Sequence, residues 1–348
     1  MDGTLGDLFR VVSASASNLL PESQLDHLLR VADRLPPSSV AGFERSLGGD
    51  PITVDFAMHF RMADPCGRTL MARAHAGQLD AIGWPELAGL FREISRPGSA
   101  LAGGIDDVWL EFDTSIGSSR PSLFVSPVDQ GALADVVTAL ATATGYARPD
   151  AGMLHSIQRL SDLPGRVFQI GLLLARSDAA VRMCIHKTGV GGMARILETL
   201  GGSRRWLIPP LERDSITGLA HVAFLAFDLT PTGIRDRIGV ELIPRPSPGP
   251  DRFESWRRML TALHTHGLCN AAEREDLVAF CGETEEDDCP DVWPANLSGF
   301  GSLPAGPVPV LNRRLHHVKL SLGATRFRAK VYFGFVQSWR YRTAALPT

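Results

Sequence analysis

The sequence predicts an α+β fold in which about ten antiparallel strands close into a β-barrel with a polar lumen, surrounded by helices in repeated α-β-β-α units. Two observations lead to this prediction. A unit of two short strands and a helix recurs about five times along the chain, and its strands alternate apolar with polar residues. Because no single copy can bury its apolar face alone, such units form closed or stacked arrays. Closure also removes unpaired sheet edges.

The repeated unit is clearest in four pairs of predicted strands. These pairs are Val108–Asp113 with Ser122–Ser126, Arg166–Ala175 with Val181–Lys187, Leu219–Leu229 with Arg235–Pro244, and Leu315–Leu322 with Arg326–Phe335. A less regular copy begins at Ile52–Arg61. Glycine, proline and aspartate bound the predicted helices. We expect helices at Leu5–Leu20, Glu22–Leu35, Trp84–Ile94, Asp129–Thr144, Ala151–Leu160, Val190–Leu200, Asp251–His266 and Ala271–Cys281.

The domain organisation follows from this order of elements. We expect one barrel domain over residues 1–348, with residues 1–36 as an N-terminal helical extension. The acidic run Glu283–Asp288 and the Pro/Gly-rich stretch Pro290–Pro309 make residues 283–309 the longest irregular segment. Such a segment is typical of a solvated loop or of a lid.

Composition limits the classes of function. The net charge of −3 and the pI near 6.4 provide no broad basic surface, so a nucleic-acid partner is not expected. No apolar run reaches the roughly 18 residues of a membrane span, and the start of the chain lacks a secretory pattern, so we expect a cytoplasmic protein without a membrane partner. The five cysteines have no short paired spacing. We therefore expect free thiols and no metal site.

Strand alternation supplies the candidate site. In Val108–Asp113, for example, Trp109, Glu111 and Asp113 lie opposite the apolar face. If helices cover the apolar faces, the polar faces line a lumen that is too wide for side chains to fill and can hold a ligand. Exposure to bulk water is the alternative for such faces. The residues predicted to face the lumen are Asp55, His59, Arg61, Trp109, Glu111, Asp113, Arg182, Cys184, His186, Glu241, His317, Lys319, Arg328, Lys330 and Tyr332.

From about residue 22 to 335 the element order resembles the ABBA prenyltransferase barrel. Its most specific local signals are Arg328-x-Lys330-x-Tyr332 and Glu111 in Val-Trp-Leu-Glu-Phe-Asp. The resemblance implies that alternating arginine, lysine and tyrosine residues hold an allylic diphosphate, while a glutamate in an early strand accepts the proton of the nucleophile. We therefore expect an enzyme that transfers a prenyl group to a small aromatic molecule or to a precursor peptide.

The resemblance assigns roles to individual residues. Glu111 would be the base, and Trp109 and Tyr332 would face the carbocation. Allylic diphosphate, often with Mg²⁺, would be a co-substrate, and no tightly bound cofactor is expected. The reaction would belong to natural-product or ribosomal-peptide tailoring in secondary metabolism, where other biosynthetic enzymes can be partners. Diphosphate would bind to Arg182, Lys319, Arg328 and Lys330.

One departure from the family opens two alternatives. The chain has only three tyrosines, and histidines occupy the inward positions His59, His186 and His317. A metal-free lanthionine-type cyclase is the first alternative: His186 or His317 would take a thiol proton, and Arg182 or Lys330 would stabilise the enolate. A non-catalytic peptide-binding barrel is the second. Cys184 could act as a nucleophile or be an inert buried thiol.

Overall fold

The strands of the protein form one closed antiparallel ring. The computed structural model describes residues 3–49, 52–114, 119–163, 165–176, 180–186, 190–201, 215–247, 251, 253–300, 306–322 and 327–341. The strands are β1 (Val40–Ser46), β2 (Val54–Arg61), β3 (Ile105–Phe112), β4 (Ser122–Pro127), β5 (Arg166–Leu172), β6 (Val181–His186), β7 (Ala220–Thr230), β8 (Gly233–Pro244), β9 (Gly282–Thr284), β10 (Pro307–Leu322) and β11 (Phe327–Tyr341).

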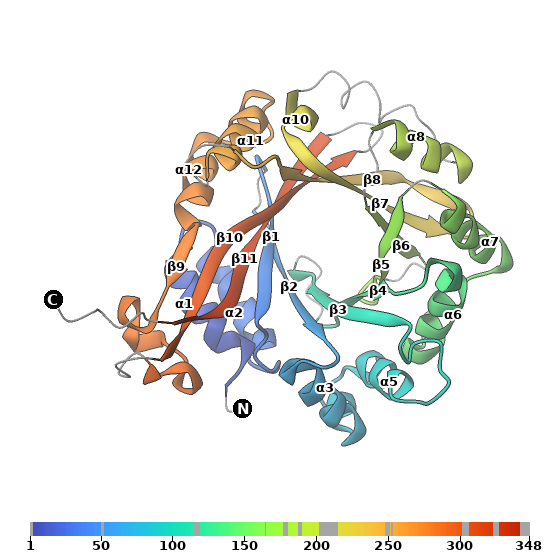
Figure 1. Ribbon diagram of the computed structural model, residues 1–348, viewed down its shortest axis with the longest axis horizontal. Helices are drawn as coiled ribbons and strands as arrows, with labels where there is room; N and C mark the ends of the chain where they lie inside the picture. Colours follow the sequence, from blue (N-terminus) through green and yellow to red (C-terminus); the bar gives the residue numbers. More distant parts are fainter. Residues whose placement is uncertain are drawn as a thin grey trace.

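Strand order confirms the predicted barrel. Within the described residues the sheet has 11 strands; β9 pairs only with β10, and the other ten follow one another in chain order. The ring closes because β11 pairs with both β1 and β10. Figure 1 shows the ring with helices on its outside. The predicted ends Lys187 and Arg326 lie outside the described residues.

Helices cover the outer face of this ring. They are α1 (Leu5–Ala14), α2 (Glu22–Ala32), α3 (Pro65–His75), α4 (Gln78–Ala81), α5 (Pro85–Ile94), α6 (Leu133–Thr144), α7 (Ala151–Arg159), α8 (Val190–Thr199), α10 (Ser215–Gly218), α11 (Glu254–Thr265) and α12 (Ala271–Phe280). Local sequence fixes several helix starts: Thr4 and Asp7 form a capping box at α1, and Asn270 and Glu273 form another at α12. None of the described helices combines the length and the apolar character needed to cross a membrane.

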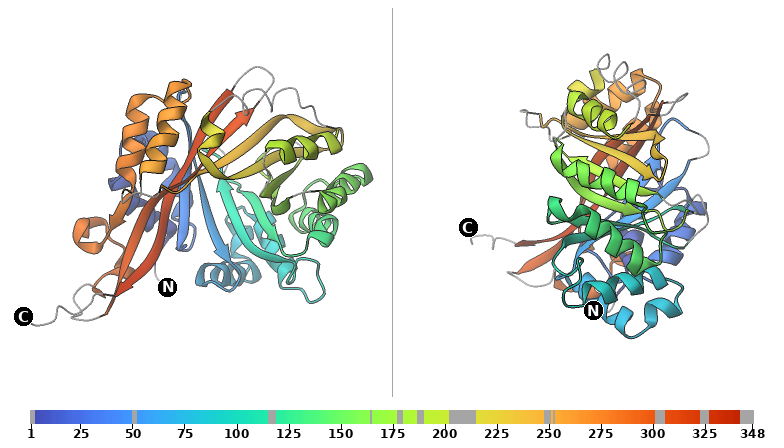
Figure 2. Two further views of the ribbon diagram at one scale, coloured as in Figure 1. Left: turned by 45° about the horizontal axis from the view of Figure 1, so that its top comes forward. Right: turned by 90° about the vertical axis from the view of Figure 1, so that its right-hand side faces the viewer.

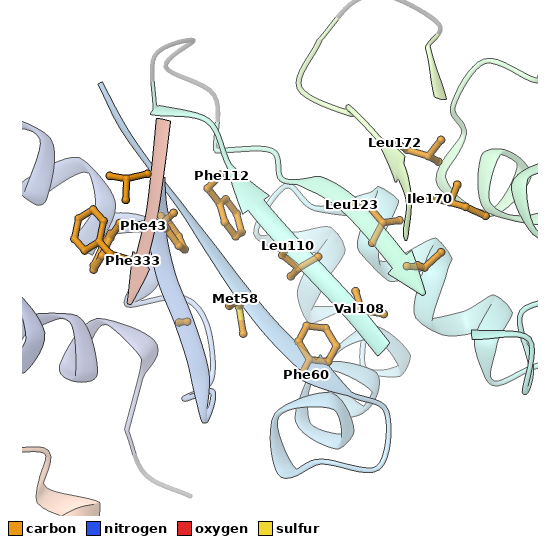
Figure 3. Packing of buried hydrophobic residues seen from close by; sticks show 14 of the residues in the cluster. Phe43, Met58, Phe60, Val108, Leu110, Phe112, Leu123, Ile170, Leu172 and Phe333 are labelled. Atoms are coloured by element: carbon orange, nitrogen blue, oxygen red, sulfur yellow. The ribbon is translucent and has the colours of Figure 1, made fainter. Parts of the chain in front are cut away.

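The core lies between the helices and the outer face of the barrel. The apolar side chains of the strands point outward into this layer, as the alternation predicted (Figure 3). In α1, for example, Phe9 packs on Phe43 and Phe56, with ring centroids 4.8 and 5.2 Å away. Burial of each such side chain contributes roughly 1.5–3 kcal/mol. With the apolar faces used in this way, the polar faces are left to line the lumen.

Several segments differ from their predicted extents. The first unit begins at β1, not at Ile52, because Val40 and Arg45 break the alternation that marks a strand and Gly42 has no side chain. Gly42 is needed there, since a Cβ atom would lie 2.6 Å from the carbonyl oxygen of Phe333. Helix α3 was also missed. Strands β10 and β11 continue well past their predicted ends and project beyond the ring (Figure 2).

The predicted extension and the predicted loop both have defined places. Helices α1 and α2, within the predicted extension 1–36, belong to the outer helical layer (Figure 1). Residues 283–309 contain most of β9, three short 3₁₀ helices and the start of β10, and residues 301–305 lie outside the described residues. Trp293 and Leu297 from this segment are buried in the core.

Candidate functional site

Two cavities occupy the lumen. The larger has a volume of about 300 Å³, the smaller about 80 Å³. The larger is lined mainly by aromatic, histidine and aliphatic side chains, and the smaller mainly by charged ones. Three residues line both cavities and so mark the boundary between them: Glu111, Arg182 and Lys319.

Aromatic rings form much of the wall of the larger cavity. Phe224, Phe168 and His186 form a cluster in which the ring centroid of Phe224 lies 4.8 Å from that of Phe168 and 4.9 Å from that of His186. Across the register of β2 and β3, the ring of His59 lies 4.7 Å from that of Trp109. Such a wall suits a planar apolar ligand.

A histidine, an aspartate and a serine that line this cavity are linked to one another. His59 Nε2 lies 3.4 Å from Asp107 Oδ2, and the Ser126 hydroxyl donates to Asp107 Oδ1 at 2.6 Å. Although burial opposes it, hydrogen bonding to His59 and Ser126 holds the pKa of Asp107 below its ordinary value. The aspartate is therefore a charged anchor that orients His59.

A pair of adjacent histidines, His316 and His317, lies nearer the boundary between the two cavities. His317 stacks on Tyr332 with centroids 3.9 Å apart, and its Nδ1 lies 2.7 Å from His316 Nδ1. Burial lowers the pKa of His317 to about 3, so its ring is neutral at pH 7 and is a weak base. Its buried Nε2 has no hydrogen-bond partner among the described residues, although Glu241 Oε2 lies 3.6 Å away.

Glu241 instead forms an ion pair with Lys319. Lys319 Nζ lies 2.8 Å from Glu241 Oε1. Burial would raise the pKa of Glu241, but the charge and the hydrogen bond of Lys319, together with its other neighbours, outweigh burial and lower that pKa to about 2. This pair is fully ionised at neutral pH and contributes no net charge to the lumen.

A buried cluster of two acids, a lysine and a tyrosine lies at the charged end. Glu44 of β1 accepts hydrogen bonds from Lys330 and from the Tyr332 hydroxyl. Asp55 Oδ2 lies 3.9 Å from Lys330 Nζ, and its Oδ1 accepts from the Thr114 amide at 2.8 Å. Burial and the charge of Glu44 raise the pKa of Asp55 to about 7. The carboxyl group of Asp55 therefore changes its protonation state near neutral pH.

Arginines complete the charged end. Arg182 binds Asp228 through two hydrogen bonds of 2.8 and 3.2 Å, and Arg176 lies 2.9 Å from Asp113. Arg237 makes one 3.5 Å contact with the Ser321 hydroxyl and no ion pair among the described residues. Partial burial and the charges of Arg182 and Arg176 lower the pKa of Arg237, which is an exposed residue at the charged end.

Glu111 is an acid of the lumen that has no partner among the described residues. Among the described residues its carboxyl group makes no hydrogen bond and no ion pair, although it lines both cavities. Burial and the charge of Glu44 raise its pKa, while Arg182, Lys319 and Lys330 oppose the rise. A carboxyl group with a raised pKa and no fixed partner is suited to exchange a proton with a ligand.

The lumen brings together most of the residues predicted from the sequence. Glu111, Trp109, Arg182, Cys184, Glu241, His59, His317, Lys319 and Tyr332 line the larger cavity, Lys330 lines the smaller one, Asp55 and Asp113 pair with residues at the charged end, and His186 stacks on the wall. Arg61 and Arg328 do not join them, because they lie exposed at opposite ends of the barrel. Burial raises the pKa of the Cys184 thiol to about 12, which leaves it protonated and inert.

Sequence reasoning missed several lining residues. Glu44 was missed together with β1. Phe224, Asp228 and Arg237 lie in strands that were predicted, and their alternation could have placed them inward. Asp107 and His316 fall where β3 and β10 have register shifts, which displace the simple alternation. Among the described residues, no group of three or more side chains could hold a metal ion.

Comparison with known proteins supports the fold. No family model matches the chain, and no curated protein matches it in sequence. The crystal structure of AnaPT from Neosartorya fischeri is similar, with a TM-score of 0.53 and 13% identity over 96% of this chain and 95% of that chain. At this identity the likeness shows the fold alone. The protein thus has the ABBA prenyltransferase-like barrel that its sequence predicted.

Proposed function

We propose that the barrel is a transferase that moves a prenyl group from an allylic diphosphate to an aromatic or peptide acceptor, in the tailoring of a natural product or ribosomal peptide. One observation carries this proposal: Glu111, which has a raised pKa and no partner among the described residues, lies where an aromatic cavity meets one lined mainly by charged side chains. A reaction between an aromatic nucleophile and an anionic leaving group needs a proton acceptor between the two.

The proposed reaction balances as follows. The allylic C–O bond breaks, and its electron pair leaves with the diphosphate. A bond forms between the allylic carbon and the nucleophilic atom of the acceptor, whose proton passes to the Glu111 carboxylate. Trp109 and Tyr332 line the larger cavity, where their aromatic rings would stabilise the developing carbocation; His317 covers one face of the Tyr332 ring.

Cations that line the smaller cavity would stabilise the diphosphate leaving group. Arg237 lacks an ion-pair partner among the described residues, and Arg182 and Lys319 line the same cavity. Cations oriented toward the leaving group stabilise the charge that develops on its oxygen. Mg²⁺ bound to the diphosphate would add to this charge.

The test is an assay of the full-length protein with dimethylallyl diphosphate, with and without Mg²⁺, against free indole compounds and synthetic peptides. We expect a product heavier by one prenyl group, release of diphosphate, and loss of both in Glu111→Gln. Absence of product across the series, with diphosphate itself unable to bind, would contradict the proposal.

Charge pairing favours a second candidate, the metal-free thioether cyclase. Arg176, Arg182, Lys319 and Lys330 each have a carboxylate partner, so the lumen is close to neutral and also suits an uncharged substrate. In that reaction a cysteine thiol of the peptide loses its proton and adds to a dehydrated residue. Ring closure of a dehydrated peptide without any diphosphate would establish it. Binding of peptide with neither reaction would indicate a non-catalytic barrel.

A further inference from the structure

The wall of the barrel has a gap along one edge of β10. Strand β8 pairs with β10 over Val318–Leu322, whereas β9 pairs with the same edge over Leu311–Arg313. On this edge of β10 no described strand pairs with residues 314–317, which lie between these two registers, whereas β11 pairs with the opposite edge. Backbone donors and acceptors on an unpaired edge readily take up another extended chain.

A groove of about 410 Å³ lies at this gap, which we call the lateral groove. Phe253 and Trp256, from the start of α11, give it an aromatic wall (Figures 1 and 2 show α11 beside β10). Arg314 lines both this groove and the larger cavity of the lumen. Arg314 therefore lies at the boundary between the lateral groove and the larger cavity. The lining residues are Phe253, Trp256, Cys281, Gly282, Asn312, Arg313, Arg314, Leu315 and Val336.

The described lining of the lateral groove is positively charged. It contains Arg313 and Arg314 and no carboxylate. Arg313 donates to neutral groups, the Thr284 hydroxyl at 2.9 Å and the Phe280 carbonyl at 2.7 Å. Arg314 makes no hydrogen bond or ion pair among the described residues. The nearby Glu283 is already paired with Arg340 at 3.0 Å.

We propose that the lateral groove binds an extended, acidic peptide segment as an added strand on β10, so that the acceptor residue of the same peptide reaches Glu111 past Arg314. Main-chain hydrogen bonds to residues 314–317 would give affinity, the aromatic wall would take alternate side chains, and Arg314 would select a carboxylate. This inference rests on the proposed function, because it names the acceptor of that reaction as a peptide.

Binding can be measured by fluorescence anisotropy with a labelled decapeptide of alternating glutamate and valine. Two control peptides carry lysine in place of glutamate, or N-methyl groups on alternate backbone nitrogens. We expect the acidic peptide to bind and both controls to fail. Arg314→Gln should weaken binding by about tenfold, the effect of one charge-assisted hydrogen bond. Arg258→Gln, on the same helix as Trp256 but outside the groove, should leave binding unchanged.

Hydrogen exchange locates the bound peptide independently of these variants. Amides within residues 314–317 should exchange more slowly when the acidic peptide is added, whereas those of β4 should not change. Equal binding of the glutamate and lysine peptides, or an unchanged exchange rate at the gap, would overturn the proposal, as would absence of binding.

Failure of the lateral-groove proposal can be distinguished from failure of the proposed prenyl transfer. Glu111→Gln should retain peptide binding while transfer is lost. If peptides fail to bind but a free aromatic compound is still prenylated in a Glu111-dependent way, only the lateral-groove proposal is wrong. If the peptide binds and no transfer occurs to any acceptor, the proposed reaction is wrong and the lateral-groove proposal still holds.

Discussion

The two cavities of the lumen are built on different physical principles. The larger is walled by rings such as Phe168, Phe224 and Trp109, and its histidine His317 is neutral. The smaller is a network in which nearly every cation meets a carboxylate, as Lys330 meets Glu44. Packing of aromatic rings stabilises the larger cavity, and ion pairing stabilises the smaller one. Changes on the aromatic side should therefore affect ligand binding, whereas changes on the charged side should affect stability as well.

Glu111→Gln should produce the largest effect, because this residue lies where the two cavities meet. Loss of a positioned general base typically lowers the rate by about 10²–10⁴-fold. Stability at neutral pH should not fall, since the variant removes an unpaired buried carboxyl group. Product formation and urea unfolding would be compared with those of Glu22→Gln, an exposed residue on α2. Full activity in Glu111→Gln would exclude it as the base.

Lys330→Met tests whether ion pairing holds the charged side together. It leaves Glu44 and Asp55 without their shared cation, and we expect a loss of about 3 kcal/mol in the free energy of unfolding. Arg328→Met is the matched control, because it lies two residues earlier on the same strand but is exposed. The control should cost less than about 0.5 kcal/mol. Similar losses in both variants would show that the buried cluster is not what stabilises this side.

Asp55→Asn tests the same cluster through pH. The folded-state pKa of Asp55 is about 7, above its ordinary 3.8, so its contribution to stability is complete below pH 3.8 and is lost as the pH rises through about 7. Asparagine keeps an acceptor for the Thr114 amide but cannot ionise. The variant should be more stable than the wild type at pH 8, by about 1–2 kcal/mol, and the gap should close at low pH. A constant difference from pH 5 to 8.5 in urea unfolding would contradict this assignment.

Phe224→Leu should have the smallest effect and should be confined to the aromatic side. It removes a ring that packs on both Phe168 and His186. We expect aromatic acceptors to bind about fivefold more weakly, corresponding to about 1 kcal/mol. Binding of inorganic diphosphate, measured by calorimetry, should be unchanged. Equal weakening of both ligands would mean that the two cavities do not act separately.

The sequence predicts the barrel well because polar and apolar residues alternate regularly along most of its strands. In β3, β6 and the inner half of β11, polar residues alternate with apolar ones, and Glu111, Arg182 and Lys330 are placed in the lumen by that period alone. Glu44 escapes prediction because β1 lacks the pattern, and His316 because a bulge displaces it.

Pairing within the lumen could not be predicted at all. Alternation places Arg182 in the lumen but does not reveal that it binds Asp228 rather than remaining free, since their contact depends on the register between β6 and β7. The same limit applies to Glu111: its lack of a partner is a property of the closed ring and not of the strand that carries it.

The central claim is that Glu111, a carboxyl group with a raised pKa, lies where the two cavities meet. This pKa can be measured without knowing the substrate. Glutamate side chains labelled with ¹³C at the carboxyl carbon would be titrated by NMR in the wild type and in Glu111→Gln. The account predicts one resonance, absent from the variant, with a pKa above the ordinary 4.5 of glutamate. A Glu111 resonance that titrates at or below 4.5 would contradict it.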